Sequence, residues 1–307
     1  MNRKLVFVHG RAQQGKDPAA LKGEWLEALG EGLRRIGVDR LPIDAADVAF
    51  PYYGDTLRDL DHGVAPDASA PVVVRGLAAG APDEAFLAAV VEQAGRAAGL
   101  DEDAVAACLE PGAGSRATTR TRGPLNWEWT QALLAALDRY VPFASGASLA
   151  LFTRDVYRYL HQARLREAIE SGVRAAFTAE REMVVVAHSL GTIVAYRLLR
   201  QAGELAGWKV PLFVTLGSPL GIQEVRRELA DADTLRLPRC AGAWFNALDE
   251  RDVVALYPLD PTHFPLDPPA PAIENYRGVR NRTENRHGIA GYLDDPEVAR
   301  RIHAALG

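Results

Sequence analysis

The stretch REMVVVAHSLGTIVAYRLLR, from Arg181 to Arg200, decides the fold of this chain of 307 residues. Its first part is a short apolar run typical of a buried strand, and its last part has the apolar spacing of an amphipathic helix. Ser189 stands at the tip of the turn between them. Such a turn needs small residues two positions before and after the serine. Ala187 and Gly191 meet that need, although glycine is usual at both places. The segment therefore predicts a nucleophile elbow, with Ser189 as the nucleophile.

Apolar runs alternate with helix-like sequence along the chain. They are bounded by turn residues and lie at Leu5 to Val8, Met183 to Ala187, Leu212 to Leu216 and Ala243 to Leu248, with a weaker strand expected near Val38 to Ile43. Parallel crossover connections place helices over a sheet and leave its strands almost wholly apolar. The sequence therefore predicts an α/β fold in which a mainly parallel sheet carries helices on both faces.

The composition excludes several classes of protein. Hydrophobic residues make up 48% of the chain and charged residues 24%, as in globular proteins and unlike disordered ones. The net charge of −5 and the scattered Lys and Arg residues argue against binding to nucleic acid. The seven histidines include no pair at metal-ligand spacing, so we expect neither a metal nor another cofactor.

The sequence also bears on location. The MNRK start is followed by an apolar run shorter than the roughly 7 to 15 residues of a signal peptide, and no run reaches the ~18 apolar residues of a membrane span. Cys108 and Cys240 are isolated among residues such as Ala, Leu and Gly, which suits small buried thiols better than a disulfide. We therefore expect a cytoplasmic protein in a reducing compartment, and the sequence leaves its oligomeric state open.

A long insertion precedes the nucleophile strand. About 140 residues separate the strand expected near residues 38–43 from Met183, far more than the usual minimum of roughly 10 to 12 residues for a crossover. One face of an expected helix in this insertion collects apolar residues, namely Leu125, Trp129, Leu133, Leu137 and Tyr140. We expect one domain over residues 1–307, with a helical cap inserted at about residues 51–160. A helical elaboration with no role at the site is the alternative.

The insertion contains aromatic residues that are costly to leave in water. They are Tyr52, Tyr53, Trp127, Trp129, Phe143 and Phe152. Ligands of open α/β folds bind at the C-terminal edge of the sheet, where Ser189 is expected to emerge. A cap closing over this edge would use the aromatic side chains to form an apolar pocket. The Gly- and Thr-rich loop from Pro111 to Pro124 is the expected flexible edge of that cap.

With these features the chain resembles the α/β-hydrolase family. Lipase- and esterase-like members of that family have a strand followed by His-Gly, which VHGR from Val8 to Arg11 resembles, and then the nucleophile elbow. The resemblance covers the sheet-forming parts from Leu5 onward and leaves the cap unplaced. It implies the α/β-hydrolase fold and a serine hydrolase that cleaves a carboxylic ester or thioester through a Ser-His-Asp triad and an acyl-enzyme. A small-molecule or lipid-like acyl ester is the expected substrate.

Two backbone amides are expected to form an oxyanion hole. The N–H of Leu190, at the N-terminus of the helix after Ser189, points where the negative charge of a tetrahedral intermediate develops. The resemblance implies that the second donor follows the His-Gly pair, which makes Arg11 the candidate and Ala12 the alternative. The residues expected to contact the substrate are Gln13, beside this loop, and Tyr52, Tyr53 and Trp129 of the cap.

The triad acid is expected after the strand at Ala243 to Leu248, because the family has the chain order serine, acid, histidine. The segment AWFNALDERDVV places two aspartates, Asp249 and Asp252, just past that strand. Its D-x-x-D-x-V pattern is similar to lipase-like hydrolases in which the second aspartate is the triad acid. Asp252 is therefore the predicted acid, with Asp249 as the alternative.

Three histidines follow these aspartates. His287 lies in a polar loop that opens a short C-terminal helix, as in the family, and is the predicted base. His263 lies in a Pro-rich loop and His303 on the exposed-looking final helix, so both are expected to be surface or packing residues. His9 and His188 flank catalytic groups, and we expect them to be structural neighbours that hydrogen-bond within the turns.

The first loop is also a near match to a nucleotide-binding motif. In LVFVHGRAQQGKD, from Leu5 to Asp17, the spacing of the glycines and Lys16 fits a P-loop, but Asp17 replaces the Ser or Thr that reaches Mg²⁺. Asp17 and Pro18 instead predict a helix N-cap with proline at the first helical position, which puts a carboxylate where a phosphate would bind. A nucleotide-binding protein stays as an alternative, as does a non-catalytic binding protein with the hydrolase fold.

Overall fold

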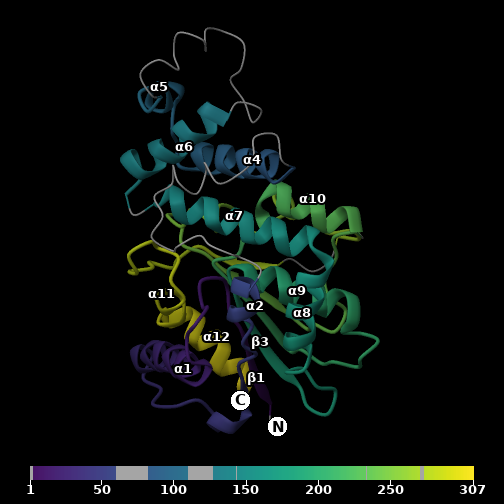
Figure 1. Cartoon of the computed structure of the whole chain (residues 1–307). Helices are drawn as coiled ribbons and strands as arrows, with labels where there is room; N and C mark the ends of the chain where they lie inside the picture. The colour runs from purple at the N-terminus through teal and green to yellow at the C-terminus, as the bar shows by residue number, and fades with distance from the viewer. Residues whose placement is uncertain (1–2, 60–81, 110–126, 143, 233, 270–272) are drawn as a thin grey trace.

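A parallel sheet forms the centre of the molecule (Figure 1). The computed structural model describes residues 3–59, 82–109, 127–142, 144–232, 234–269 and 273–307. Within these residues, one sheet holds six strands, all parallel to their neighbours, in the order β2-β1-β3-β4-β5-β6. The strands are β1 (Lys4–Val8), β2 (Val48–Ala49), β3 (Met183–His188), β4 (Leu212–Leu216), β5 (Trp244–Ala247) and β6 (Glu274–Tyr276). The predicted α/β class is confirmed at this level.

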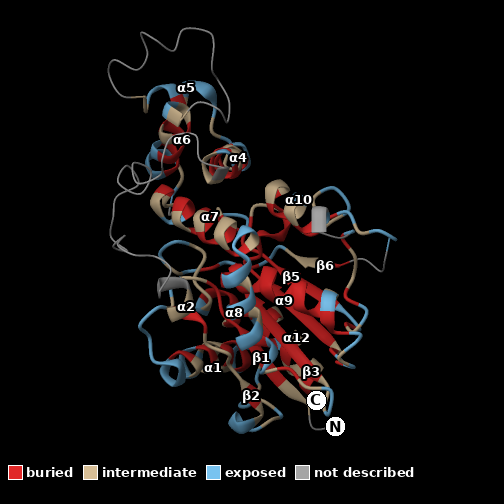
Figure 2. Cartoon of the chain, turned by 45° about the vertical axis from the view of Figure 1, so that its right-hand side comes forward, coloured by how far each residue is buried: buried red, intermediate tan, exposed pale blue. Residues whose placement is uncertain are grey.

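Each central strand contributes side chains to two hydrophobic cores, one on either face of the sheet. In β1 and β3, Val6 and Val185 face one core while Phe7 and Val184 face the other, and all four are completely buried. Successive residues of a strand point to opposite faces, so a strand covered on both sides must be apolar throughout. This explains why the apolar runs predicted the four strands β1, β3, β4 and β5 correctly (Figure 2).

The strand expected near Val38 to Ile43 does not form. This segment is a connection after α1, and the short edge strand β2 follows at Val48–Ala49, paired with β1. Pro42 lacks an N–H to donate to a neighbouring strand, and the 3-10 turn η1 (Ala45–Asp47) intervenes before the chain reaches the sheet. The apolar side chains of Leu41 and Ile43 instead pack partly buried against the core.

Helices cover both faces of the sheet. On one face lie α1 (Pro18–Arg35), α11 (Ala290–Leu293) and α12 (Pro296–Leu306), and on the other α8 (Ala163–Arg174) and α9 (Leu190–Ala202). Helix α10 (Gln223–Ala232) lies beyond the end of the sheet in Figure 1. The short helix α2 (Gly54–Asp59) follows β2, and η2 (Pro219–Gly221) follows β4. The predicted start of α1 is confirmed, because the Asp17 carboxylate accepts hydrogen bonds from the amides of Ala19 and Ala20 with Pro18 at the first position.

A group of helices from the insertion stands beyond one end of the sheet. It comprises α4 (Pro82–Ala97), α5 (Glu102–Ala106), α6 (Trp127–Tyr140) and α7 (Gly146–His161). In Figures 1 and 2, α7 lies between the sheet domain and the other three helices, which we call the outer cap helices. Gly146 permits the close packing of α6 on α7, since a Cβ there would lie 2.6 Å from the carbonyl oxygen of Leu134.

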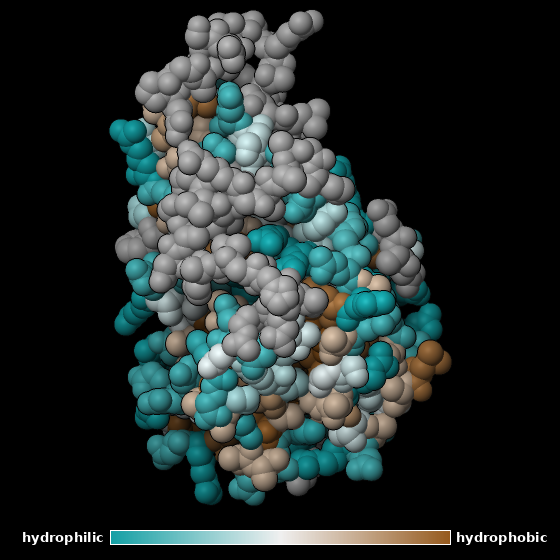
Figure 3. All heavy atoms as spheres, in the orientation of Figure 1, coloured by the Kyte–Doolittle hydropathy of each residue, from teal (hydrophilic) through white to brown (hydrophobic). Residues whose placement is uncertain are grey.

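The apolar face predicted for α6 is partly correct. Leu133 and Leu137 are buried, whereas Tyr140 is 43% exposed because α6 ends there. Leu125, Phe143 and the loop from Pro111 to Pro124 lie outside the described residues. The described surface is mostly hydrophilic in the view of Figure 3, with small scattered hydrophobic patches. In the part of the chain that the structure describes, no helix combines the length and apolar character needed to cross a membrane.

Candidate active site

The turn between β3 and α9 holds Ser189 in a strained conformation, as predicted. Its φ of 55° and ψ of −129° lie in a region that non-glycine residues rarely adopt. A Cβ on Gly191 would lie 2.4 Å from the carbonyl oxygens of Val8 and His9, and one on Gly10 would lie 2.7 Å from the Ser189 Cβ. Glycine at these two positions therefore lets the loop after β1 approach the serine closely. The serine itself is only 1% exposed, so it is less open than a turn position suggests.

Three residues from distant parts of the chain meet at this turn. His287 Nε2 lies 2.8 Å from Ser189 Oγ, and His287 Nδ1 lies 2.7 Å from Asp252 Oδ2. A carboxylate can only accept hydrogen bonds, so Nδ1 carries the ring proton and Nε2 is left as an acceptor for the serine hydroxyl. The structure thus brings the predicted nucleophile, base and acid into one hydrogen-bonded chain.

Asp252 is held so that one oxygen faces the histidine. Its side chain is fully buried, in the loop after β5. Oδ1 accepts hydrogen bonds from the amides of Val254 and Ala255, at 2.9 and 3.4 Å, while Oδ2 accepts from the phenol of Tyr292 at 2.6 Å and from His287. Both oxygens therefore have two donors, and this full set fixes the orientation of the carboxylate.

Asp249, the alternative acid, has a different set of partners. Its buried carboxylate pairs with the Arg251 guanidinium at 2.5 Å and accepts the Asn281 amide at 2.7 Å. Burial raises the pKa of Asp249, but the hydrogen bonds from Arg251 and from the Arg251 and Asn281 amides outweigh it, so the pKa is lowered. The Asn281 side chain in turn accepts a hydrogen bond from the Thr283 hydroxyl and donates one to the Gly288 carbonyl. Thr283 and Gly288 flank His287 in the sequence. Asp249 therefore anchors the loop that carries the histidine.

His188 fixes the main chain of the same loop. Its Nε2 lies 2.8 Å from the carbonyl oxygen of His287, to which it must donate. Burial, and next the neighbouring His287, keeps the pKa of His188 well below its ordinary value, so the ring is neutral. We expected His188 to hydrogen-bond within its own turn, and the structure instead places its bond across to the histidine loop.

His9 orients the peptide that leads to Arg11. Its Nε2 accepts the amide of Tyr53 at 3.0 Å, so its Nδ1 carries the proton and donates to the carbonyl oxygen of Gly10 at 2.7 Å. The N–H of a trans peptide points opposite to its carbonyl, so the Arg11 N–H points away from the His9 ring. Burial lowers the pKa of His9 to about 4, although the bond to Gly10 raises it. Because the ring is neutral, Nε2 remains an acceptor for the Tyr53 amide while Nδ1 donates to Gly10.

Further contacts hold the loop after β1. The Tyr52 hydroxyl donates to the Gln13 carbonyl at 2.6 Å, and the Gln13 side-chain amide donates to the Arg11 carbonyl at 3.0 Å. The Tyr53 hydroxyl donates to the His9 carbonyl. Arg11 Nε binds the Asp155 carboxylate of α7 at 2.6 Å. These bonds support Ala12, whose φ of 59° is unusual for a residue with a Cβ.

Leu190 begins α9 directly after Ser189. As the first helical residue, it has no acceptor for its N–H within the helix. The positive end of the helix dipole adds to the potential at this point. The structure therefore places both predicted oxyanion donors next to Ser189. Leu190 follows it directly in the sequence at the start of α9, and Arg11 lies on the loop that Gly10 brings against the serine.

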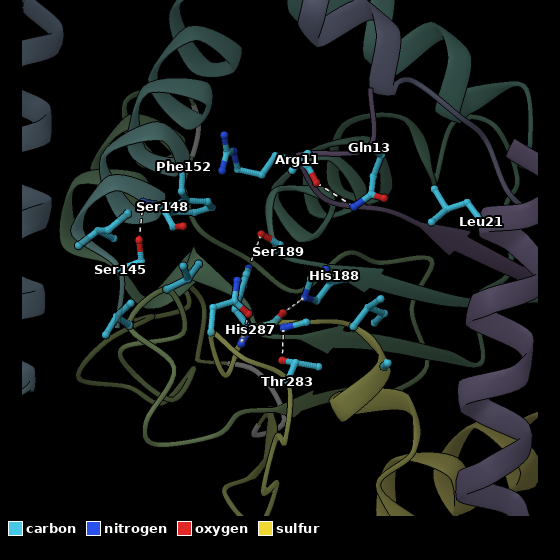
Figure 4. A pocket seen from close by; sticks show the side chains of 18 of the residues that line it. Arg11, Gln13, Leu21, Ser145, Ser148, Phe152, His188, Ser189, Thr283 and His287 are labelled. Carbon is cyan, nitrogen blue, oxygen red and sulfur yellow. Dashed lines mark hydrogen bonds between the residues drawn. The ribbon is translucent and has the colours of Figure 1, made fainter. Parts of the chain in front are cut away.

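A cavity of about 360 Å³ opens beside Ser189 and His287 (Figure 4). One wall comes from the loop after β1 and the start of α1, including Arg11, Gln13 and Lys16, and a second from the start of α7. The remaining wall comes from the loops after β5 and before α11. The residues of the α7 wall are Ser145, Ser148, Leu149 and Phe152, and those of the remaining wall include Val253, Val254, Thr283, Asn285 and Ile289.

Of the four residues predicted to contact substrate, the structure brings only Gln13 to this cavity, as far as the described residues form it. Tyr52 and Tyr53 support the loop after β1 from behind, through the hydroxyl bonds given above. Trp129 lies on α6 and packs partly buried against the hydrophobic core. The expectation that these three line an acyl pocket is therefore not met, because their partners are protein groups.

The α7 wall was not singled out by the sequence, apart from Phe152. This residue is 2% exposed, and its ring centroid lies 6.3 Å from that of His287. Ser145 caps α7 by accepting the Ser148 amide at 3.2 Å, and that N-cap pattern was the available signal that a helix begins beside the site. Tyr292, which contacts Asp252, was also missed, since AGYL reads as an ordinary apolar helix turn.

The other predicted histidines lie apart from the serine. His263 binds Asp260 at 2.8 Å and stacks on Tyr257, and His303 is on α12. Among the described residues, no group of three or more His, Cys, Asp and Glu side chains is placed to hold a metal ion. Comparisons with protein-family models, with curated proteins and with solved structures found no match to this chain.

Proposed function

We propose that this protein is a serine hydrolase of the α/β-hydrolase type, which cleaves a carboxylic ester or thioester through an acyl-enzyme. The observation that carries the proposal is the chain of two hydrogen bonds from Ser189 through His287 to Asp252, at 2.8 and 2.7 Å. Serine alone is a poor nucleophile, and this arrangement is the one that activates it. The family resemblance of the elbow and the His-Gly loop supports the same conclusion.

The chemistry follows from the two roles of the imidazole. His287 Nε2 takes the proton of Ser189 as the serine oxygen bonds to the acyl carbon. The carbonyl oxygen becomes negative and accepts hydrogen bonds from the amides of Leu190 and Arg11. Collapse of this intermediate breaks the bond to the leaving alcohol or thiol, which receives the proton from His287. Water then repeats the sequence on the acyl-serine and releases the acid.

The cavity favours a compact acyl group. Its volume is near the lower end of the ~300 to 1,000 Å³ range of ligand pockets. Leu149, Phe152 and Val254 provide apolar surface beside the serine, whereas Gln13 and Lys16 make the opposite wall polar. We infer that a short acyl chain lies along the α7 wall and that the leaving group is polar.

The nucleotide alternative is disfavoured at the first helix. Asp17 accepts the amides of Ala19 and Ala20, so a carboxylate already occupies the N-terminus at which a P-loop binds phosphate. A non-catalytic binding protein would tolerate a displaced acid or histidine, and neither Asp252 nor His287 is displaced from bonding geometry. Both alternatives lack the activated serine on which the proposal rests.

A fluorophosphonate probe tests the proposal. It reacts with activated serines, so we expect it to label the intact protein once, with the modified peptide containing Ser189. The change Ser189→Ala should abolish labelling and ester hydrolysis. Ser148→Ala is the matched control, because Ser148 lines the same cavity and is more exposed but has no histidine partner in the described structure. Labelling that survives Ser189→Ala, or is lost only in Ser148→Ala, would contradict the assignment.

A further inference from the structure

Tyr292 hydrogen-bonds to Asp252, the acid of the candidate triad, at the same carboxylate oxygen that contacts His287. The tyrosine lies on α11 and is completely buried. Its hydroxyl lies 2.6 Å from Asp252 Oδ2, and the same oxygen lies 2.7 Å from His287 Nδ1. Two donors therefore share one carboxylate oxygen, one from the base and one from a phenol that the mechanism above does not use.

The direction of the Tyr292 hydrogen bond is settled by counting donors. A phenol has one proton, and the ionised Asp252 carboxylate can only accept, so that proton points at Oδ2. The phenol oxygen also receives a donor, the amide of Asp249, at 3.3 Å. Burial, and then the charge of Asp252, raises the pKa of Tyr292 well above its ordinary value, so the hydroxyl stays protonated. Tyr292 is therefore a permanent donor to this oxygen.

The position of the phenol is fixed by its surroundings. Gly217, at the end of β4, has a φ of 56°, and a Cβ there would lie 3.1 Å from the Tyr292 ring and 3.2 Å from the His287 ring. The His188 and Tyr292 rings are 5.9 Å apart. The start of α11 follows the histidine loop directly, so one short segment delivers both donors to Asp252.

We propose that Tyr292 is a positioning residue for the Asp252 and His287 pair, and that its hydroxyl sets the pH below which the imidazole stops accepting the serine proton. This inference rests on the proposed function. A purely structural contact would help to hold Asp252 in place but would not change the pH at which His287 takes up a proton. A hydrogen bond to Oδ2 draws negative charge away from His287, so the protonated imidazole gains less from the carboxylate.

Among the described residues, the other ionisable groups near this pair include Arg11, paired with Asp155 of α7, and Lys16, both in the cavity wall after β1. His188 approaches from β3 and is neutral, and Asp249 approaches from the loop after β5 with its charge paired to Arg251. Ser189 lies directly before α9. Tyr292→Phe removes two hydrogen bonds of the phenol oxygen, the one donated to Asp252 Oδ2 and the one accepted from the Asp249 amide. Of these two, the bond to Oδ2 is the one made to the carboxylate that contacts His287, so the change should act on His287 through Asp252.

The change Tyr292→Phe tests the proposal with the ring retained. We expect the acid limb of the kcat/KM profile to move to higher pH by roughly 0.5 to 1 pH unit, with KM little changed. Tyr196→Phe is the matched control, since Tyr196 is equally buried and its hydroxyl donates to the Arg236 carbonyl, away from the cavity. An acid limb that stays in place in Tyr292→Phe, or that moves equally in Tyr196→Phe, would overturn the proposal.

A second variant keeps the test decisive if Tyr292→Phe is poorly folded. Site-specific 3,5-difluorotyrosine at position 292 retains the ring and the hydroxyl and makes the phenol a stronger donor. The acid limb should then move to lower pH, opposite to the phenylalanine variant. A shift in the same direction for both variants would show that packing, and not the hydrogen bond, links Tyr292 to the histidine.

Titration of the His287 ring by NMR separates this inference from the proposed function, because it needs no substrate. The resonance is assigned by its loss in His287→Asn. We expect its titration midpoint to lie at higher pH in Tyr292→Phe than in the unchanged protein. If the midpoint moves but no ester is hydrolysed, Tyr292 acts as inferred and the hydrolase proposal fails. If esters are hydrolysed through Ser189 and the midpoint does not move, only the role of Tyr292 fails.

Discussion

The sheet edge that carries the candidate active site and the outer cap helices differ in how far local sequence determines them. At the edge, Ser189, Asp252 and His287 come from separate segments and meet within hydrogen-bond distance. In the cap, Leu133 and Leu137 of α6 are buried as expected, but Tyr140 is exposed and Trp129 packs partly buried against the core, outside the lining of the described cavity. A residue at the end of a parallel strand has a fixed destination, whereas an apolar helix face specifies burial without specifying the partner.

The clearest way to sharpen this comparison is to change one aspartate of the edge at a time. Asp252→Asn should lower kcat by about 10⁴-fold, because an amide in place of the carboxylate selects the wrong tautomer of His287. KM should change little, since Asp252 does not line the cavity in the described structure. Steady-state kinetics with a short-chain p-nitrophenyl ester measures both values.

Asp249→Asn is the control for that change. It removes the charge that pairs with Arg251 and weakens the anchor of Asn281, so we expect a loss of about 1 to 3 kcal/mol in the free energy of unfolding. The loss in kcat should be far smaller than for Asp252→Asn. If Asp249→Asn has the larger effect on kcat while remaining folded, the two aspartates exchange roles.

Acid stability should also distinguish the two regions. In the folded protein His9 has a pKa of about 4, whereas the unfolded chain binds this proton near pH 6.5. Between these values the unfolded state holds more protons, so the free energy of unfolding falls as the pH falls, by about 3 kcal/mol for His9. The contribution of His9 to the free energy of unfolding should be fully present above pH 6.5 and should decline toward pH 4.

Two variants test whether His9 is the source of this acid sensitivity, with the free energy of unfolding measured in urea at several pH values. His9→Gln keeps one donor and one acceptor but does not titrate, so the dependence of stability on pH should become shallower. His161→Gln is the comparison in the cap, because His161 is a partly exposed residue at the end of α7. An unchanged slope in His9→Gln would show that the buried ring is not the source.

The smallest expected effect concerns the wall of the cavity. Phe152→Leu should alter the ratio of kcat/KM values for butyrate and acetate esters by roughly 3- to 10-fold, because Phe152 lies in the α7 wall. Trp129→Ala should leave that ratio unchanged, since Trp129 packs against the core. A change in the Trp129→Ala ratio as large as that of Phe152→Leu would restore the prediction that the outer cap helices contact the acyl chain.

The sequence was sufficient for the central strands and for the residues that follow them. The apolar runs identified β1, β3, β4 and β5 because strands buried on both faces allow few polar residues. The turn at Ser189 could be predicted from the sequence because its strained conformation requires small neighbouring residues. One of these, Gly191, lies against the carbonyl groups of Val8 and His9. Each of these signals is local, so no knowledge of distant packing was needed.

The sequence was insufficient where distant partners decide. Nothing in the segment around Asp249 and Asp252 shows that one binds Arg251 and Asn281 while the other receives Tyr292. The apolar residues of Val38 to Ile43 suggested a strand, but they pack as a connection. The same limit applies to Tyr53, which was predicted to contact the substrate but is hydrogen-bonded to His9 through its amide and its hydroxyl.

The central claim is that Ser189 carries the acyl group during turnover. Rapid mixing of the protein with p-nitrophenyl acetate, followed by acid quench and mass spectrometry, tests it most directly. We predict one acetyl group for each chain, located on Ser189, formed in a burst of p-nitrophenol and absent from Ser189→Ala. Hydrolysis by the unchanged protein with the acetyl group on another residue, or hydrolysis by Ser189→Ala at an undiminished rate, would contradict the account.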